Sequence, residues 1–181
     1  MTETKRNVIL TGFMATGKTS VGKALAARLG YEFVDLDSLI EAEAGMPISR
    51  IFATQGEERF RELESRMVMQ VARRDASIIA TGGGAIVNPR NLEALQRSGV
   101  VIALTAKPEA ILARVGSGED RPMLWGGEPL ERIRRLLADR APAYAKADLT
   151  VDTTEQSIDQ VVGHILNALQ ARRGGPSEAG S

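Results

Sequence analysis

The stretch that decides the fold is GFMATGKT, residues 12–19 of a 181-residue chain. It matches the pattern G-x-x-x-x-G-K-[ST], in which glycines let backbone N–H groups converge on phosphate oxygens at the start of a helix. The apolar run Asn7–Thr11 before it predicts a strand, and the apolar spacing of Ser20–Leu29 after it predicts a helix. We therefore predict that residues 12–19 form a phosphate-binding loop, called the phosphate loop below.

Two side chains of the phosphate loop have a predicted part in the chemistry. Lys18 is expected to reach the β- and γ-phosphates of a nucleotide, and the Thr19 hydroxyl is expected to ligate Mg²⁺. The helix that starts here adds about half a positive charge at its N-terminus. The residues predicted to contact the nucleotide at this loop are Ala15, Thr16, Gly17, Lys18, Thr19 and Ser20.

The rest of the chain alternates predicted strands and helices. Strands are predicted at 32–35, 77–80, 100–105 and 149–152, and helices at 37–44, 48–54, 57–74, 89–97, from 108, at 130–138 and at about 156–172. This alternation predicts a three-layer α/β/α domain with a five-stranded parallel sheet, and a ligand site beyond the carboxyl ends of its strands. We expect residues 1–173 to form one domain and 174–181 a disordered tail.

The composition excludes several classes of protein. The 23 basic and 23 acidic residues cancel, so no global field recruits nucleic acid. With no cysteine and one histidine, His164, which we expect to be structural or solvent-facing, any metal must be held by oxygen atoms. No stretch approaches about 18 uninterrupted apolar residues and Met1–Asn7 is polar, so we expect neither a membrane span nor a signal peptide. A cytoplasmic protein follows as the expectation.

Asp35-Leu36-Asp37 follows the second predicted strand, on the same rim of the sheet as the phosphate loop. If the strand persists that far, alternation sends both carboxylates to one side. Asp35 could then approach the water shell of the metal, and Asp37 could take the hydroxyl of an acceptor alcohol. Asp37 is also well suited to cap the helix that follows, and that alternative stays open.

Two further motifs have both a functional and a structural interpretation. The third strand runs into Thr81 and the glycines 82–84, which would let a substrate lie against the backbone or would simply form a tight turn. In the helix at 57–74, Arg61 and Glu64 lie one turn apart and can face each other. The sequence alone favours a solvated surface pair there.

The connection at about 115–127, VGSGEDRPMLWGG, has four glycines and a proline, which predicts a lid rather than a regular element. Arg114 lies at its start and Arg121 within it, and a mobile arginine stabilises charge on a transferring phosphoryl group. Further on, Arg140 and Tyr144 have i, i+4 spacing and would point the same way on a helix. Arg140 could bind an anionic substrate group or be exposed.

Phosphate loops occur in GTPases, motors and kinases, so other features must discriminate. The chain contains neither Asn-Lys-x-Asp nor Asp-x-x-Gly, which disfavours a GTPase. A motor ATPase would usually end its third strand in an acidic residue that holds Mg²⁺, whereas glycines follow this strand.

Together and in this order, the motifs resemble those of one family, the shikimate kinases. The resemblance extends from Asn7 to about Leu169 and rests on the phosphate loop, Asp35-Leu36-Asp37, residues 60–64 (FRELE), 81–84 (TGGG) and 121–124 (RPML), and Arg140 with Tyr144. It implies a P-loop kinase of nucleoside-monophosphate-kinase-like architecture with a mobile lid. It also implies an enzyme that uses Mg²⁺ to transfer the γ-phosphoryl of ATP to the 3-hydroxyl of shikimate, on the way to chorismate and the aromatic amino acids. We expect a monomer.

The roles that the resemblance implies fall into three groups. Shikimate would be bound by Asp37, Arg61, Gly82, Gly83 and Arg140, the two arginines holding its carboxylate. ATP would be bound outside the phosphate loop by Arg114 and Gln156 near the base and by Arg121 at the phosphates. Mg²⁺ would be held by Thr19 and, through water, by Asp35, and the catalytic residues would be Lys18, Asp37 and Arg121.

The chain departs from the family pattern at Ala15, where a glycine is frequent. A negative φ would tolerate the alanine, whereas a left-handed one would cost about 1 kcal/mol or more. Two acids, Glu119 and Asp120, also precede Arg121 in the lid. The rival interpretations are another small P-loop kinase, such as a gluconate or nucleoside-monophosphate kinase, and a nucleotide-binding regulatory domain without turnover.

Overall fold

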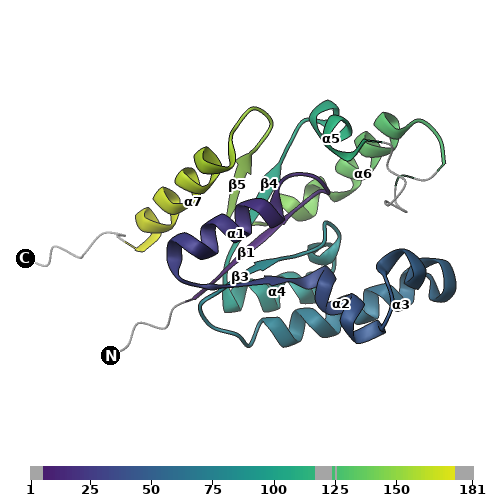
Figure 1. Ribbon diagram of the computed structural model, residues 1–181, viewed down its shortest axis with the longest axis horizontal. Helices are drawn as coiled ribbons and strands as arrows, with labels where there is room; N and C mark the ends of the chain where they lie inside the picture. Colours follow the sequence, from purple (N-terminus) through teal and green to yellow (C-terminus); the bar gives the residue numbers. More distant parts are fainter. Residues whose placement is uncertain (1–5, 117–123, 125, 174–181) are drawn as a thin grey trace, which may run out of the picture.

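Strand β1 (Asn7–Gly12) is fully buried and lies at the centre of the sheet. In the computed structural model (Figure 1), which describes residues 6–116, 124 and 126–173, the sheet is five-stranded and parallel. The other strands are Glu32–Asp35 (β2), Ser77–Ala80 (β3), Gly99–Thr105 (β4) and Leu149–Asp152 (β5). The predicted five-stranded parallel sheet is confirmed.

The order of the strands is β2-β3-β1-β4-β5. Leu10 of β1 lies opposite Ala80 of β3 on one side and opposite Ile102 of β4 on the other. The chain therefore builds the sheet in one direction from β1 and then continues on its other side. In open α/β sheets, ligands bind beyond the carboxyl ends of the strands at such a switch point. The phosphate loop leaves β1 at this place.

Helices cover both faces of the sheet (Figure 1). On one face, α1 (Lys18–Leu29) and α7 (Ile158–Arg173) form a core that includes Leu10. On the other face, α3 (Ile48–Val71) and α4 (Pro89–Ser98) form a second core that includes Ile9 of β1. Because successive side chains of a strand point to opposite faces, β1 supplies both cores. The three-layer α/β/α architecture is confirmed.

The remaining helices connect the layers. They are α2 (Leu36–Ala44), α5 (Pro108–Val115), α6 (Pro129–Tyr144) and a short 3-10 helix, η1 (Ala85–Val87). Helix η1 was not predicted. Helix α6 is longer than the predicted 130–138, because it continues through Pro142. This longer helix brings the side chains of its last turn to the sheet.

Helix α3 merges the two helices predicted at 48–54 and 57–74. The break between them is a kink at Gly56, whose backbone (φ 82°, ψ 170°) is not helical. The C-terminal part of α3, after the kink, supplies most of the buried residues that this helix contributes to the core beside the sheet.

Part of the predicted lid and all of the predicted tail lie outside the described residues. The undescribed segments are 1–5, 117–123, 125 and 174–181. Leu124 is described, and it is buried in a small cluster with Phe13, Ile111 and Ile133. A residue of the lid segment thus packs against the phosphate loop and the helices on either side of the lid.

Candidate active site

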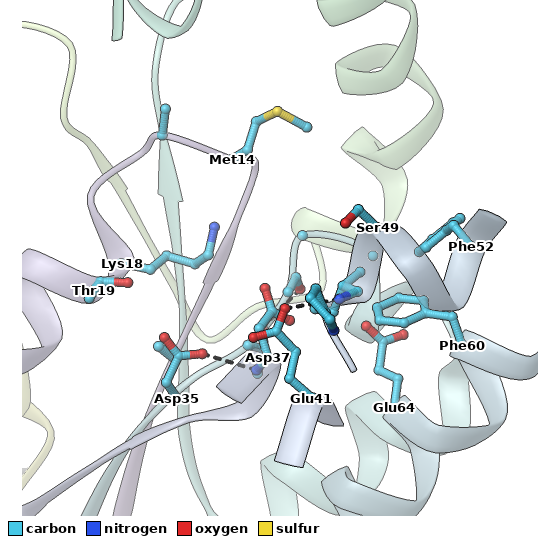
Figure 2. Close-up of a pocket in the computed structure, with 18 of the residues that line it drawn as sticks. Met14, Lys18, Thr19, Asp35, Asp37, Glu41, Ser49, Phe52, Phe60 and Glu64 are labelled. Atoms are coloured by element: carbon cyan, nitrogen blue, oxygen red, sulfur yellow. Dashed lines mark hydrogen bonds between the residues drawn. The ribbon is translucent and has the colours of Figure 1, made fainter. Parts of the chain in front are cut away.

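One cavity of about 600 Å³ opens at the carboxyl ends of the strands. Figure 2 shows Lys18 and Thr19 on one side of it, Asp37 and Glu41 near its centre, and Phe60 and Glu64 on the far side. The predicted site residues that line it are Ala15, Gly17, Lys18, Thr19, Ser20, Asp35, Asp37, Arg61, Gly82, Gly83 and Arg140. The structure therefore brings most of the predicted phosphate and substrate residues to one place.

The phosphate loop forms one end of the cavity. Gly12 has a φ of 136°, and a Cβ there would collide with the carbonyl oxygen of Leu104. Lys18, the first residue of α1, donates from Nζ to the carbonyl oxygens of Gly12 (2.8 Å) and Phe13 (2.7 Å). These bonds hold the ammonium group beside the helix N-terminus, where both charges favour an anion.

Ala15 has a left-handed backbone, with φ at 57°. The left-handed conformation is the costlier of the two considered for Ala15, because the following carbonyl group crowds the Cβ there. The next residue, Thr16, is buried and donates from Oγ1 to Phe13 O at 2.8 Å, so it supports the loop from inside. Internal hydrogen bonds thus hold Gly12 and Phe13 of the phosphate loop, whereas none of them is made to the strained Ala15.

Asp35, and not Asp37, caps helix α2. Its Oδ1 accepts from the amides of Asp37 (3.0 Å) and Ser38 (3.3 Å). The capping alternative for Asp37 is therefore wrong, because the helix begins at Leu36, one residue earlier than predicted. The strand also stops before Asp37, so alternation along a strand is not what brings the two carboxylates together. Asp37 lines the cavity from the first turn of α2 (Figure 2).

At each of the glycines 82–84, a charged side chain lies in or beside the space that an added side chain would occupy. A Cβ on the first would lie 3.1 Å from Asp37 Oδ1, and one on the second 2.8 Å from Arg140 Nη1. A Cβ on the third would lie 2.6 Å from Arg61 Nη1. One carboxylate and two guanidinium groups thus border the same short stretch of backbone, which lines the cavity.

The Arg61–Glu64 pair is not a solvated surface pair, as the sequence favoured. Arg61 Nη1 donates to Glu64 Oε1 at 2.8 Å, and Glu64 is only 1% exposed. Burial raises the pKa of the Glu64 carboxyl, against the opposing effect of Arg61, and the nearby Asp37 raises it further. Glu64 Oε2 is buried and has no hydrogen-bond partner among the described residues. The pair is part of the cavity wall.

Arg140 and Tyr144 reach the glycines together from α6. Arg140 is 8% exposed, and its guanidinium lies 5.4 Å from the centre of the Phe13 ring. Tyr144 donates from its hydroxyl to Gly83 O at 2.7 Å. Burial raises the pKa of the Tyr144 phenol, so the hydroxyl keeps the proton that it donates. The exposed alternative for Arg140 is wrong.

Two charged residues of the cavity, Glu41 and Glu64, had no predicted functional part. For Glu64 a signal was available in the sequence, because it falls on the apolar stripe formed by Phe60, Leu63, Met67 and Val68, all of which are buried. The aromatic wall was also missed. Phe52 and Phe60, on either side of the kink in α3, lie with ring centres 4.8 Å apart and line the cavity.

The residues predicted for the base of the nucleotide lie elsewhere. Arg114 is exposed and donates to backbone oxygens of Ala15 and Thr153. Gln156 lines a smaller cavity of about 330 Å³ beside β5 and α7, together with the exposed His164. The solvent-facing alternative for His164 is confirmed. Arg121 lies outside the described residues.

The oxygen donors proposed for a metal share one wall of the cavity. Thr19 and Asp35 both line it, and Figure 2 shows both on the same side as Lys18. The described residues contain no group of three or more acidic or histidine side chains that could hold a metal ion. One carboxylate and one hydroxyl suit Mg²⁺, which usually keeps several waters and takes its other ligands from phosphates.

Comparison with known proteins gives one consistent result. A family model described as shikimate kinase matches residues 14–170. A shikimate kinase of Thermoanaerobacter pseudethanolicus is 46% identical over 90% of this chain and 95% of the relative, and one of Geobacter sulfurreducens is 48% identical over 88% of each. The crystal structure of shikimate kinase from Acinetobacter baumannii in complex with shikimate superposes with a TM-score of 0.90, at 37% identity over 94% of this chain and 96% of that chain.

Proposed function

The chain belongs to the shikimate kinase family, and from this membership we propose which of its residues carry out each part of the reaction. It is a shikimate kinase, which transfers the γ-phosphoryl of ATP to the 3-hydroxyl of shikimate and releases ADP. The observation that carries the assignment of residues is the shared cavity, with the phosphate loop at one end and a pair of buried or half-buried arginines at the other.

At the phosphate end, the loop amides and Lys18 bind the triphosphate. Lys18 already lies across the loop in contact with Gly12 and Phe13, so a small movement of its flexible side chain brings Nζ to the β- and γ-oxygens. Charge develops on these oxygens as the phosphoryl group leaves ADP, and a fixed ammonium in a partly enclosed site stabilises it. Lys18 therefore acts directly in the transfer.

At the acceptor end, Arg61 and Arg140 hold the carboxylate of shikimate. Both border the glycines 82–84, and each guanidinium can form charge-assisted hydrogen bonds with a carboxylate. The glycines let the ring approach the backbone. This orientation directs a ring hydroxyl toward Asp37, which lies beside Gly82 and, in Figure 2, between Lys18 and Phe60. Asp37 accepts a hydrogen bond from the hydroxyl and aligns it for attack.

Mg²⁺ is the proposed cofactor, with Thr19 and Asp35 as its protein groups. A hydroxyl and a carboxylate that both line the cavity support this choice, because Mg²⁺ takes oxygen ligands. Bound with ATP, the ion would neutralise charge on the phosphates. Asp35 Oδ1 is used by the cap of α2, so the other carboxylate oxygen is the one that would face a water of the ion.

Three predicted ATP-binding residues are not among the described residues that line the cavity. We propose that Arg121 approaches the phosphates from the lid at 115–127, and that Arg114 and Gln156 lie near the base of ATP. We also propose a monomer in which residues 1–173 form one domain, acting in the cytoplasm. No helix in the described ranges has the length and apolar character that crossing a membrane requires.

A panel of acceptors tests the function. ADP release is measured with shikimate, gluconate, AMP or no acceptor, each with ATP and Mg²⁺. We expect ADP to be released only in the arm that contains shikimate. Release with gluconate or AMP would indicate another small P-loop kinase, release without an acceptor would indicate a hydrolase, and none in any arm would indicate a regulatory domain that only binds nucleotide.

A further inference from the structure

Two residues hold the phosphate loop from outside the cavity. Thr153, in the turn after β5, contacts the carbonyl oxygen of Thr16 with its hydroxyl at 3.0 Å. Arg114, in the last turn of α5, donates from Nη1 to the carbonyl oxygen of Ala15 at 3.0 Å. Neither residue is among the described residues that line the cavity. The Thr153 hydroxyl shares its single proton between Thr16 O and Thr105 O, which lies 3.1 Å away. Two successive carbonyl groups of the loop, those of Ala15 and Thr16, are therefore contacted by this pair.

The two side chains also bind each other. Arg114 Nη1 donates to Thr153 Oγ1 at 3.2 Å, and Nη2 donates to Thr153 O at 2.7 Å. Thr153 is 4% exposed, and its amide donates to the carbonyl oxygen of Thr105 on β4 at 2.8 Å. We call these contacts the Arg114–Thr153 network. It ties the loop to β4 and to the turn after β5, at the edge of the sheet.

By fixing two carbonyl groups, the network also orients the backbone amides of the residues that follow them. In a trans peptide, the C=O of one residue and the N–H of the next point in opposite directions. Bonds that fix the carbonyl groups of Ala15 and Thr16 therefore turn the amides of Thr16 and Gly17 the other way. That way is the inside of the loop, where phosphate oxygens are expected to bind.

The hydrogen bond from Arg114 is made at Ala15, the residue of the phosphate loop with a strained backbone. Ala15 has a left-handed backbone, and an alanine in this region persists only when its surroundings hold it there. The hydrogen bond from Arg114 is made to the carbonyl group of that same residue. Without it, the peptide between Ala15 and Thr16 is free to rotate toward a less strained conformation, which would turn the Thr16 amide away from the phosphates.

We propose that Arg114 and Thr153 are positioning residues, which act on phosphoryl transfer by orienting the amides of the phosphate loop. The proposal rests on the proposed function, since the loop must bind a polyphosphate. It assigns Arg114 an effect on the phosphates that does not depend on the base of ATP. A ligand that has the phosphates and lacks the base therefore separates the two roles.

The test measures binding of tripolyphosphate with Mg²⁺ by titration calorimetry, in parallel with binding of ADP. Thr153→Val keeps the shape of the side chain and removes the hydroxyl, and we expect its Kd for tripolyphosphate to rise about tenfold. Thr153→Ser should restore wild-type binding. Thr150→Val, at an exposed threonine of β5, is the matched control and should bind as the wild type does.

Steady-state kinetics add a readout that a purely structural role would not move. Thr153→Val should raise the KM for ATP and leave the KM for shikimate unchanged. A folded Thr153→Val protein that binds tripolyphosphate as tightly as the wild type would overturn the proposal. If Thr153→Val does not fold, Arg114→Met takes its place: weaker binding of tripolyphosphate supports the proposal, and weaker binding of ADP alone overturns it. A wild type that binds neither ligand would instead contradict the phosphate-binding function itself.

Discussion

Arg61 and Glu64 form an ion pair in which only one partner is buried. Nη1 of the arginine lies 2.8 Å from Oε1 of the glutamate, whose side chain is 2% exposed against 32% for the arginine. The buried carboxylate has little freedom to move, so its hydrogen bond restricts the position of the half-buried guanidinium. Glu64 therefore holds the Arg61 guanidinium beside Gly84, at the lining of the cavity.

The first prediction concerns the pH dependence of stability. The pKa of Glu64 is raised above 4.5, so the folded state binds its proton more tightly than the unfolded state. The contribution of this group is therefore fully present below pH 4.5, the value in the unfolded chain, and is lost as pH rises through the raised pKa. Urea unfolding at a series of pH values should show wild type losing stability relative to Glu64→Gln over this window.

The control for this effect is Glu62→Gln, because Glu62 is exposed and pairs with the exposed Arg59. Its unfolding, measured over the same pH series, gives the effect of removing an exposed carboxylate, against which the effect of Glu64→Gln is compared. A wild type that instead gains stability over Glu64→Gln as pH rises would show that Arg61, and not burial, dominates the pKa of Glu64.

The second prediction concerns the shikimate carboxylate. Arg61→Ala should raise the KM for shikimate about 10- to 100-fold, because it removes charge-assisted hydrogen bonds worth about 1.5–3 kcal/mol. The KM for ATP should stay close to that of the wild type. Arg59→Ala, two residues away in an exposed pair, should change neither constant. An effect of Arg61→Ala on ATP alone would mean that this arginine does not hold the acceptor.

The third prediction concerns the close packing at the glycines. Gly83→Ala should weaken shikimate binding, because its Cβ would lie 2.8 Å from Arg140 Nη1 and 3.0 Å from Gly12 O and must displace one of them. Calorimetric titration with shikimate measures the loss. The matched control is Gly163→Ala on α7, where nothing lies near the added Cβ. That change should stabilise the helix by about 0.5–1 kcal/mol and leave binding intact. Equal binding by both variants would contradict the contact.

The fourth prediction concerns backbone strain. Ala15→Gly should raise the free energy of unfolding by about 0.5–1 kcal/mol, since relief of about 1–2 kcal/mol of strain exceeds the entropy that glycine adds to the unfolded chain. Ala76→Gly tests the same effect at a second left-handed residue, with φ at 49°, which does not line the cavity. Both variants should gain stability by a similar amount in thermal unfolding. A loss of stability in both would show that these residues are not strained.

Much of the fold followed from the sequence because local patterns were strong. The phosphate loop has one arrangement in a strand–loop–helix unit, and β2, β3 and β5 have the predicted bounds. The errors arose where tertiary packing decides. Helix α6 continues through Pro142, which a local pattern would use to end a helix, because its last turn packs against the glycines through Tyr144.

The candidate site was predictable as a set of residues but not as a geometry. Spacing alone could not show that Glu64 is buried, because an arginine and a glutamate one turn apart have the same pattern on a surface. Nor could it show that Asp35 caps α2 and leaves Asp37 for the cavity, since both are good caps. The contacts of Arg114 with the phosphate loop join residues 99 positions apart, which no local pattern reveals.

The central claim is that one cavity joins the phosphate loop to a pocket for a small acidic alcohol. Its most direct test is to locate the transferred phosphate by phosphorus–proton correlation NMR, after incubating the wild-type protein with ATP, Mg²⁺ and shikimate. The account predicts a single phosphate ester whose phosphorus couples to the proton on ring carbon 3. Phosphorus found only as inorganic phosphate, or as an ester at another ring position, would contradict it.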